Sequence, residues 1–178
     1  MFGRLLTSIV MLPGTVLVAV PGLILWATGG TDAAGRWIGF QAPAFWVAAI
    51  LGLGGLALAA WTVRLFVSEG RGTPAPWDPP ERFVVRGPYR HVRNPMIGAV
   101  FLMLTAEALL FDSWPLGVWL AIFYFANALY IPRFEERGLE KRFGVPYRRY
   151  LENVPRWFPS PMAYDPQERT PQTDGKPE

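Results

Sequence analysis

Four apolar runs follow one another along most of the chain. They cover residues 5–27, 44–63, 96–111 and 114–131, and polar segments separate them. Because a helix rises about 1.5 Å per residue, the first two runs are long enough to cross a hydrocarbon core of about 30 Å. The last two are shorter, and only Asp112 and Ser113 separate them, which predicts a helical hairpin. The pattern therefore predicts an all-α, multi-pass membrane protein with about four transmembrane helices.

The first run has a second interpretation, because Arg4 precedes it as a basic residue precedes a cleaved signal peptide. The apolar region of a signal peptide is about 7–15 residues long and ends in a small-residue cleavage site. Residues 5–27 form a longer run, and no A-x-A site follows it. We therefore predict that this run is a transmembrane helix.

Basic residues are distributed unevenly around the four runs. Of the 17 Lys and Arg residues, all but Arg36 lie before the first run, between the second and third, or after the fourth. Cytosolic loops carry an excess of Lys and Arg, so this distribution predicts that both termini lie inside. The compact, Arg-, Gly- and Pro-rich chain favours a bacterial inner membrane, although a protein of the endoplasmic reticulum would show the same topology.

Composition excludes several kinds of site. The chain has a net charge of +3, but its basic residues flank apolar runs, so orientation in a membrane explains them better than nucleic-acid binding. No cysteine is present, which excludes disulfides, thiolate zinc sites and a cysteine nucleophile. His91 is the single histidine, which argues against a histidine metal site or a Ser-His-Asp triad. We therefore predict no metal, and no phosphate-binding or dinucleotide-binding glycine motif occurs.

Two polar segments on the predicted inner side carry the candidate chemistry. Residues 68–94 precede the third run, and residues 132–159 follow the fourth as a helix, a turn and a second short helix. Because the last two runs form an antiparallel hairpin, Arg93-Asn94 and Glu135-Glu136 should converge at its inner end. An equally weighted alternative is that the basic residues anchor to lipid head groups and the carboxylates are solvated. Residues 1–164 are predicted to form one domain, and residues 165–178 a disordered tail.

The residues of these two segments resemble a known family. The chain reads GPYRHVRNPMIG at residues 87–98 and FEERGLEKRFGVPYRRYLENVPRWFP at residues 134–159. With the hairpin between them, these strings resemble the isoprenylcysteine carboxyl methyltransferase and phospholipid methyltransferase superfamily of small membrane enzymes. The resemblance covers roughly residues 81–159. The positions that match the pattern of the superfamily are Gly87, Tyr89, Arg93, Asn94, Pro95, Glu135, Glu136, Leu139, Phe143, Gly144, Tyr147 and Tyr150.

The resemblance implies methyl transfer from S-adenosylmethionine to a lipophilic acceptor at the cytosolic membrane face. A carboxylate such as Glu135 would hold the amino group or ribose of this cofactor, and Arg82 or Arg93 would pair with its carboxylate. Tyr89 would pack on the adenine or the sulfonium. The full set of cofactor-binding residues that the resemblance implies is Arg82, Phe83, Val84, Tyr89, Arg93, Asn94, Pro95, Met96, Ile97 and Glu135.

The acceptor is predicted to be a carboxylate on an isoprenylcysteine-like molecule. The alternatives are a phospholipid amine, or a non-catalytic membrane protein that retains the fold. Arg133 would orient an anionic acceptor, or would equally serve as a basic anchor at the membrane, and Glu136 would act as base toward an amine. Both are thus candidate catalytic residues.

Three positions depart from the pattern of the superfamily. Asn94 stands where the superfamily usually has a histidine, and Ile97 stands where it often has a tyrosine. Ile131 lies near the position at which the eukaryotic carboxyl methyltransferases have an arginine that orients the substrate. The last departure weakens the prenylcysteine interpretation unless Arg133 substitutes. Glu107 lies within the third run, where a carboxylate is either functional or hydrogen-bonded to a neighbouring helix, and the second interpretation is slightly favoured.

Overall fold

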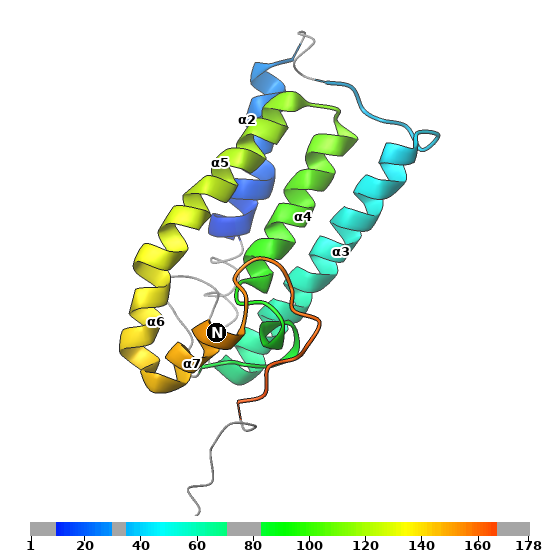
Figure 1. Cartoon of the computed structure of the whole chain (residues 1–178). Coiled ribbons are helices and arrows are strands. Elements are labelled where there is room, and N and C mark those ends of the chain that lie inside the picture. Colours follow the sequence, from blue (N-terminus) through cyan, green and yellow to red (C-terminus); the bar gives the residue numbers. More distant parts are fainter. Residues whose placement is uncertain (1–9, 30–34, 71–82, 167–178) are drawn as a thin grey trace, which may run out of the picture.

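The computed structural model describes residues 10–29, 35–70 and 83–166, and in these ranges the chain is entirely helical where it is regular. The all-α prediction is confirmed (Figure 1). Arg82 and the part of the predicted tail beyond residue 166 lie outside the described residues. In chain order the elements are η1 (Val10–Ala19), α2 (Val20–Ala27), α3 (Pro43–Leu65), η3 (Phe66–Gly70), η4 (Gly87–Arg90), α4 (Pro95–Leu110), α5 (Trp114–Tyr130), η5 (Ile131–Glu135), α6 (Glu136–Phe143) and α7 (Val145–Asn153).

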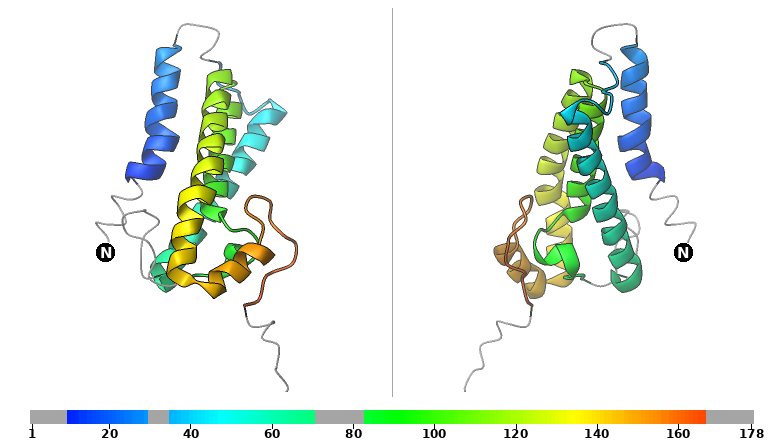
Figure 2. Two further views of the ribbon diagram at one scale, coloured as in Figure 1. Left: turned by 60° about the vertical axis from the view of Figure 1, so that its left-hand side comes forward. Right: turned by 90° about the vertical axis from the view of Figure 1, so that its right-hand side faces the viewer.

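Two of these helices are long and apolar enough to cross a membrane by length and composition. They run from Pro43 to Glu69 and from Trp114 to Phe143, with mean hydropathies of 1.9 and 1.4. The first and third predicted spans form shorter apolar helices, Pro13–Ala27 and Pro95–Leu110. Helix length therefore supports two of the four predicted crossings directly. Figure 2 shows the apolar helices side by side, with α6 and α7 gathered at one end of them.

Helices α3 and α4 approach closely at the glycines of the second apolar run. A Cβ atom at Gly55 would lie 2.8 Å from Cγ of Met103 and 2.9 Å from the carbonyl oxygen of Ala99. At Gly52 a Cβ would touch that of Ala106 at 3.5 Å. Small residues permit such backbone contact between apolar helices, which lack a hydrophobic driving force inside a membrane.

The predicted hairpin of α4 and α5 is present. Asp112 closes its turn with a φ of 44°, a left-handed conformation that aspartate tolerates better than most residues. Within α4, Oε2 of Glu107 is buried and has no hydrogen-bond partner in the described part of the chain. The sequence favours a hydrogen bond from this carboxylate to a neighbouring helix, and none is found for Oε2 in the described part of the chain.

The sequence predicts that the fourth apolar run ends at residue 131 and that a separate helix follows it. In the structure the helix continues through this point. Helices α5, η5 and α6 are continuous, because a π-helical turn at Ile131–Glu135 carries the backbone past Pro132 (Figure 1). Proline lacks an N–H and its ring clashes with the carbonyl four residues back, so a wider turn relieves both problems. The predicted turn after α6 is confirmed at Gly144, whose φ of 63° suits glycine.

The segment after α7 folds back onto the loop that precedes α4. The backbone N–H of Arg93 donates to the carbonyl of Pro155, and those of Ser160 and Tyr164 donate to His91 and Arg90, each at 2.9 Å. Tyr147, Tyr150 and Val154 form a buried cluster beneath this contact, against which Phe83 and Leu139 pack. The two polar segments of the sequence therefore meet at the end of the α4–α5 hairpin opposite its turn, as predicted.

Candidate functional site

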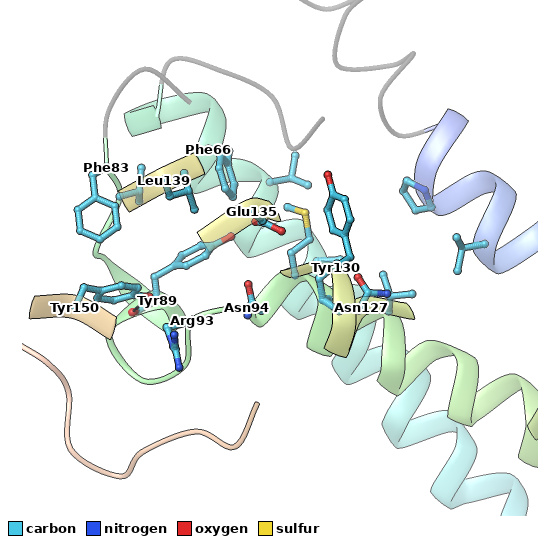
Figure 3. A pocket seen from close by; sticks show the side chains of 18 of the residues that line it. Phe66, Phe83, Tyr89, Arg93, Asn94, Asn127, Tyr130, Glu135, Leu139 and Tyr150 are labelled. Atoms are coloured by element: carbon cyan, nitrogen blue, oxygen red, sulfur yellow. Dashed lines mark hydrogen bonds between the residues drawn. The ribbon is translucent and has the colours of Figure 1, made fainter. Parts of the chain in front are cut away.

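A cavity of about 380 Å³ lies where these segments meet the apolar helices (Figure 3). Its wall includes residues of η1, α3, η3, the loop before η4, η4, α4, α5, η5, α6 and α7. One end carries polar and aromatic side chains, and the other end is apolar and lies between the helices. Such a volume suits a small molecule or cofactor.

Tyr89 reaches the cavity because Gly87 allows the chain to turn beneath α3. Gly87 has a φ of 53°, and a Cβ there would lie 3.0 Å from the ring of Trp61. The Tyr89 carbonyl accepts a hydrogen bond of 2.7 Å from the hydroxyl of Tyr150, and its ring meets Phe66 edge-on. Burial, with smaller effects of Tyr150 and Glu135, raises the pKa of Tyr89 well above its ordinary value. Tyr89 is therefore a neutral phenol at physiological pH.

Glu135 lies in the π-helical turn, and its carboxylate is on the cavity wall on the side of the Tyr89 hydroxyl (Figure 3). Within the described residues no hydrogen bond or ion pair engages this carboxylate. Part of the residue is exposed to solvent. A free carboxylate at the polar end can receive a cationic or hydroxyl-bearing group.

Glu136 points the other way and is held in a buried ion cluster. Its Oε1 lies 2.7 Å from a guanidinium nitrogen of Arg93 and 2.9 Å from Nε of Arg156, while its Oε2 lies 2.8 Å from Arg156. Burial lowers the pKa of Arg93, while the hydrogen bond to Glu136 raises that of Arg156. The two adjacent carboxylates therefore have different environments, and only Glu135 lines the cavity.

Two buried nitrogen atoms at the polar end have no partner in the ranges that the structure describes. They are Nε of Arg93 and Nδ2 of Asn94, both on residues that line the cavity. A buried donor without an acceptor costs free energy, so an acceptor supplied by a ligand would be stabilising here. Asn94 stands just before α4, whose first turn begins at Pro95.

The apolar end of the cavity extends between the helices. Pro13 and Val16 of η1 line it together with residues of α3, α4 and α5. Asn127 and Tyr130 of α5 lie between the two ends and face the cavity (Figure 3). A ligand with a polar head and an apolar tail would match this gradient.

The structure brings most of the predicted cofactor residues to one cavity. Its wall contains Phe83, Val84, Tyr89, Arg93, Asn94, Met96, Ile97 and Glu135. Pro95 is buried beside it without lining it, and Arg82 lies outside the described residues. Arg133 is exposed away from the cavity and donates to the carbonyl of Leu129 at 3.3 Å. The convergence of the two segments was therefore predictable, whereas the separation of Glu135 from Glu136 was not.

Two polar residues of the cavity were missed by the sequence analysis. Asn127 and Tyr130 belong to the predicted apolar span of residues 114–131. Spacing alone does not connect Asn127 with Glu135, because the π-helical turn at Ile131–Glu135 shifts the residues that follow it relative to a regular helix. Arg156 was also missed, because no spacing rule links it to Glu136.

A known protein family matches more than half of the chain. The family described as phospholipid methyltransferase matches residues 43–145, from the start of α3 into α7. No curated protein matches the chain significantly. The matched part contains both long apolar helices, η4 and both carboxylates, while η1, α2 and the segment after α7 lie outside it.

Proposed function

Because the chain belongs to the phospholipid methyltransferase family, we propose that its cavity holds the methyl donor beside a lipophilic acceptor. The family relationship makes the chain an S-adenosylmethionine-dependent methyltransferase. When bound, this cofactor supplies an electrophilic methyl group on a positively charged sulfur. The observation that carries the proposal is that one cavity joins the polar end at Glu135 to an apolar end between the helices.

The residues of the polar end fit the chemical groups of the cofactor. Glu135, whose carboxylate has no partner among the described residues, suits the amino group or the ribose hydroxyls, and Arg93 is a cation for the carboxylate. Nδ2 of Asn94 is a buried donor that still needs an acceptor. Tyr89 and Phe83 provide aromatic surfaces for the adenine or the cationic sulfur. We assign these five side chains to cofactor binding.

We propose a lipophilic carboxylate as the acceptor, methylated on oxygen. A carboxylate needs no base, and Glu136 is committed to two arginines rather than free to remove a proton. Asn127 and Tyr130 can donate hydrogen bonds to an anionic head while the tail occupies the apolar end. Arg133 lies outside the cavity, so its assignment as an orienting residue loses support in favour of a basic anchor at the membrane.

A phospholipid amine is the second candidate acceptor. It is favoured by the description of the matching family and by the free carboxylate of Glu135, which would attract an ammonium head. An amine must lose a proton before it can attack, so this route requires a base in the cavity. Glu135 is the carboxylate that lines the cavity and is placed to act as this base.

We further propose an integral membrane protein with four crossings and both termini inside. The distribution of basic residues supports this topology, and the cavity then lies at the inner membrane face, where the acceptor enters from the bilayer. A bacterial inner membrane is the proposed location. The shorter helices η1–α2 and α4 would cross with little tilt.

Calorimetric binding of S-adenosylmethionine to the protein in lipid nanodiscs tests the cofactor site. We expect Glu135→Gln and Asn94→Ala each to weaken binding at least about tenfold, equivalent to about 1.4 kcal/mol. Glu152→Gln, on the exposed surface of α7, is the matched control and should bind like the parent protein. No binding by the folded parent protein would refute the proposed site.

Radiolabelled cofactor then distinguishes the acceptors. Lipid acids and lipid amines are supplied in separate nanodisc preparations, and the labelled product is treated with mild base. A methyl ester releases volatile methanol under base, whereas a methylated amine retains its label. Base-labile product supports the carboxylate, and base-stable product from amine lipids replaces it with the second candidate.

A further inference from the structure

The loop of residues 155–164, PRWFPSPMAY, lies outside the segment that matches the family. We refer to it as the C-terminal loop. It rises from the end of α7 to the level of the inner turns of α4 and then returns (Figures 1 and 2). Backbone hydrogen bonds from Ser160 to His91 and from Tyr164 to Arg90, both 2.9 Å, hold it in place. The loop therefore has a defined position beside the helices.

Trp157 connects this loop to the two helices of the hairpin. Its ring centroid lies 5.6 Å from that of Phe101 in α4 and 5.8 Å from that of Tyr124 in α5. Phe101 and Tyr124 are each roughly two turns from the inner end of their helix, or about 9 Å at 1.5 Å per residue. If α4 and α5 cross the membrane, Trp157 therefore lies at the depth of the inner leaflet.

The apolar side chains on either side of the loop tip point away from the protein. Phe158 is 85% exposed and Met162 is 82% exposed. Both stand on the same loop as Trp157, whose ring packs on helices that the proposed topology surrounds with lipid. An aqueous position would leave these two large apolar surfaces in water, whereas a lipid position would bury them.

The polarity of the loop changes along its height. Its base carries the ion pair of Arg90 with Asp165 at 3.3 Å, while its tip is apolar. Prolines at positions 159 and 161 remove two backbone donors at the tip. The N–H of Ser160 donates to the carbonyl of His91 and that of Met162 to the hydroxyl of Ser160. These absent or paired donors need no hydration, which lowers the cost of placing irregular backbone at a membrane interface.

We propose that the C-terminal loop inserts Phe158 and Met162 into the boundary between head groups and acyl chains of the inner leaflet. The partner is the phospholipid bilayer itself, bound through its acyl chains. This inference rests on the proposed membrane topology. Because the same loop carries Arg156 to Glu136, the inserted loop also connects a lipid contact to the ion cluster beside the cavity.

The cysteine-free chain allows a direct test with single labels. Phe158→Cys and Met162→Cys are labelled with an environment-sensitive fluorophore in nanodiscs whose lipids carry a nitroxide near the head-group end of the acyl chain. Ile122→Cys, on the exposed face of α5, is the lipid control, and Glu152→Cys on α7 is the aqueous control. We expect quenching of about half or more of the fluorescence at the loop positions, as for a membrane-inserted side chain.

The controls separate failure of the loop inference from failure of the topology. If the label at Ile122 is quenched while the labels at the loop positions remain as unquenched as the label at Glu152, the loop inference is overturned. The proposed membrane placement would then still stand. Absence of quenching at Ile122 as well would refute the membrane placement on which the inference rests. Each variant is used only as a monodisperse size-exclusion peak, and two loop positions keep the test decisive if one variant misfolds.

Discussion

At the scale of single residues, the fold gives two adjacent carboxylates opposite roles. Glu136 is 8% exposed and shared by Arg93 and Arg156, whereas Glu135 lines the cavity without a protein partner among the described residues. A buried carboxylate that neutralises two guanidinium groups is costly to remove, because the remaining cations repel each other in a poorly hydrated place. We therefore regard Glu136 as a residue that positions Arg93 at the cavity.

Replacing Glu136 with alanine should destabilise the protein by about 3 kcal/mol, since it leaves two partly buried arginines unpaired. Thermal unfolding in detergent, followed by circular dichroism, measures this. Glu140→Ala removes the exposed partner of Arg148 and should cost less than about 1 kcal/mol. Equal shifts for both variants would contradict the role of the buried cluster.

Three buried tyrosines are expected to make the stability of the folded protein fall at alkaline pH. Burial is the largest cause that raises the pKa of Tyr89, Tyr147 and Tyr150 above their ordinary value. An unfolded chain ionises its tyrosines near pH 10, whereas the folded chain keeps these three protonated. Their contribution to the free energy of unfolding is therefore complete below about pH 10 and is lost as pH rises toward the folded pKa.

Unfolding midpoints measured between pH 8 and pH 11.5 would test this expectation. The unfolding midpoint of Tyr147→Phe should fall less steeply with pH than that of the parent protein above about pH 10, because the variant lacks one phenol whose pKa is raised in the folded state. Parallel curves for the two proteins would show that this phenol does not contribute.

At the scale of elements, the π-helical turn at Ile131–Glu135 determines which residue of α5 and α6 faces the cavity. The N–H of Glu136 donates to the carbonyl of Ile131, five residues back, instead of four. One extra residue in a turn rotates everything that follows by about 100° relative to a regular helix. The orientation of Glu135 therefore depends on this turn.

Pro132→Ala should restore the missing N–H and allow a regular α-helix. We expect the affinity for S-adenosylmethionine to fall roughly tenfold without loss of stability, because Glu135 would rotate off the cavity wall. Calorimetry checks the affinity. Pro115→Ala, in the first turn of α5 where proline is well tolerated, is the control and should leave binding unchanged.

The close contact of α3 with α4 at Gly55 predicts that a larger residue at this position destabilises the protein. Gly55→Ala places a Cβ within 3 Å of both Met103 and the Ala99 carbonyl, so the helices must separate. We expect a cost of about 1–3 kcal/mol. Gly54→Ala meets nothing within 4 Å and should be neutral or slightly stabilising. Thermal unfolding of the two variants in detergent distinguishes them, and equal midpoints would argue against close helix contact.

At the scale of the whole molecule, the arrangement places the polar elements at one end of the apolar helices. The loops at the two ends differ in charge, and α6, α7 and the C-terminal loop gather at the basic end (Figure 2). A membrane protein with this asymmetry should have a single orientation, because the basic loops resist translocation.

A membrane-impermeant maleimide tests that orientation in vesicles. Glu152→Cys should react in inside-out vesicles and stay protected in right-side-out ones, since α7 lies at the basic end. Gly39→Cys, in the exposed loop before α3, should show the opposite pattern. The same accessibility at both positions would refute the odd number of crossings, α3, α4 and α5, that we propose between them.

The sequence by itself determined the helical class, the four apolar runs and the convergence of Tyr89, Asn94 and Glu135. Those features depend on apolar runs and on a two-residue turn, which are formed by residues close together in sequence and can therefore be recognised from the sequence alone. Only the tertiary structure decided that Glu135 faces the cavity while Glu136 pairs with Arg156, and that the loop after α7 lies beside the hairpin. These outcomes depend on a π-helical turn and on contacts between residues distant in sequence, whose energies exist only when the chain is packed.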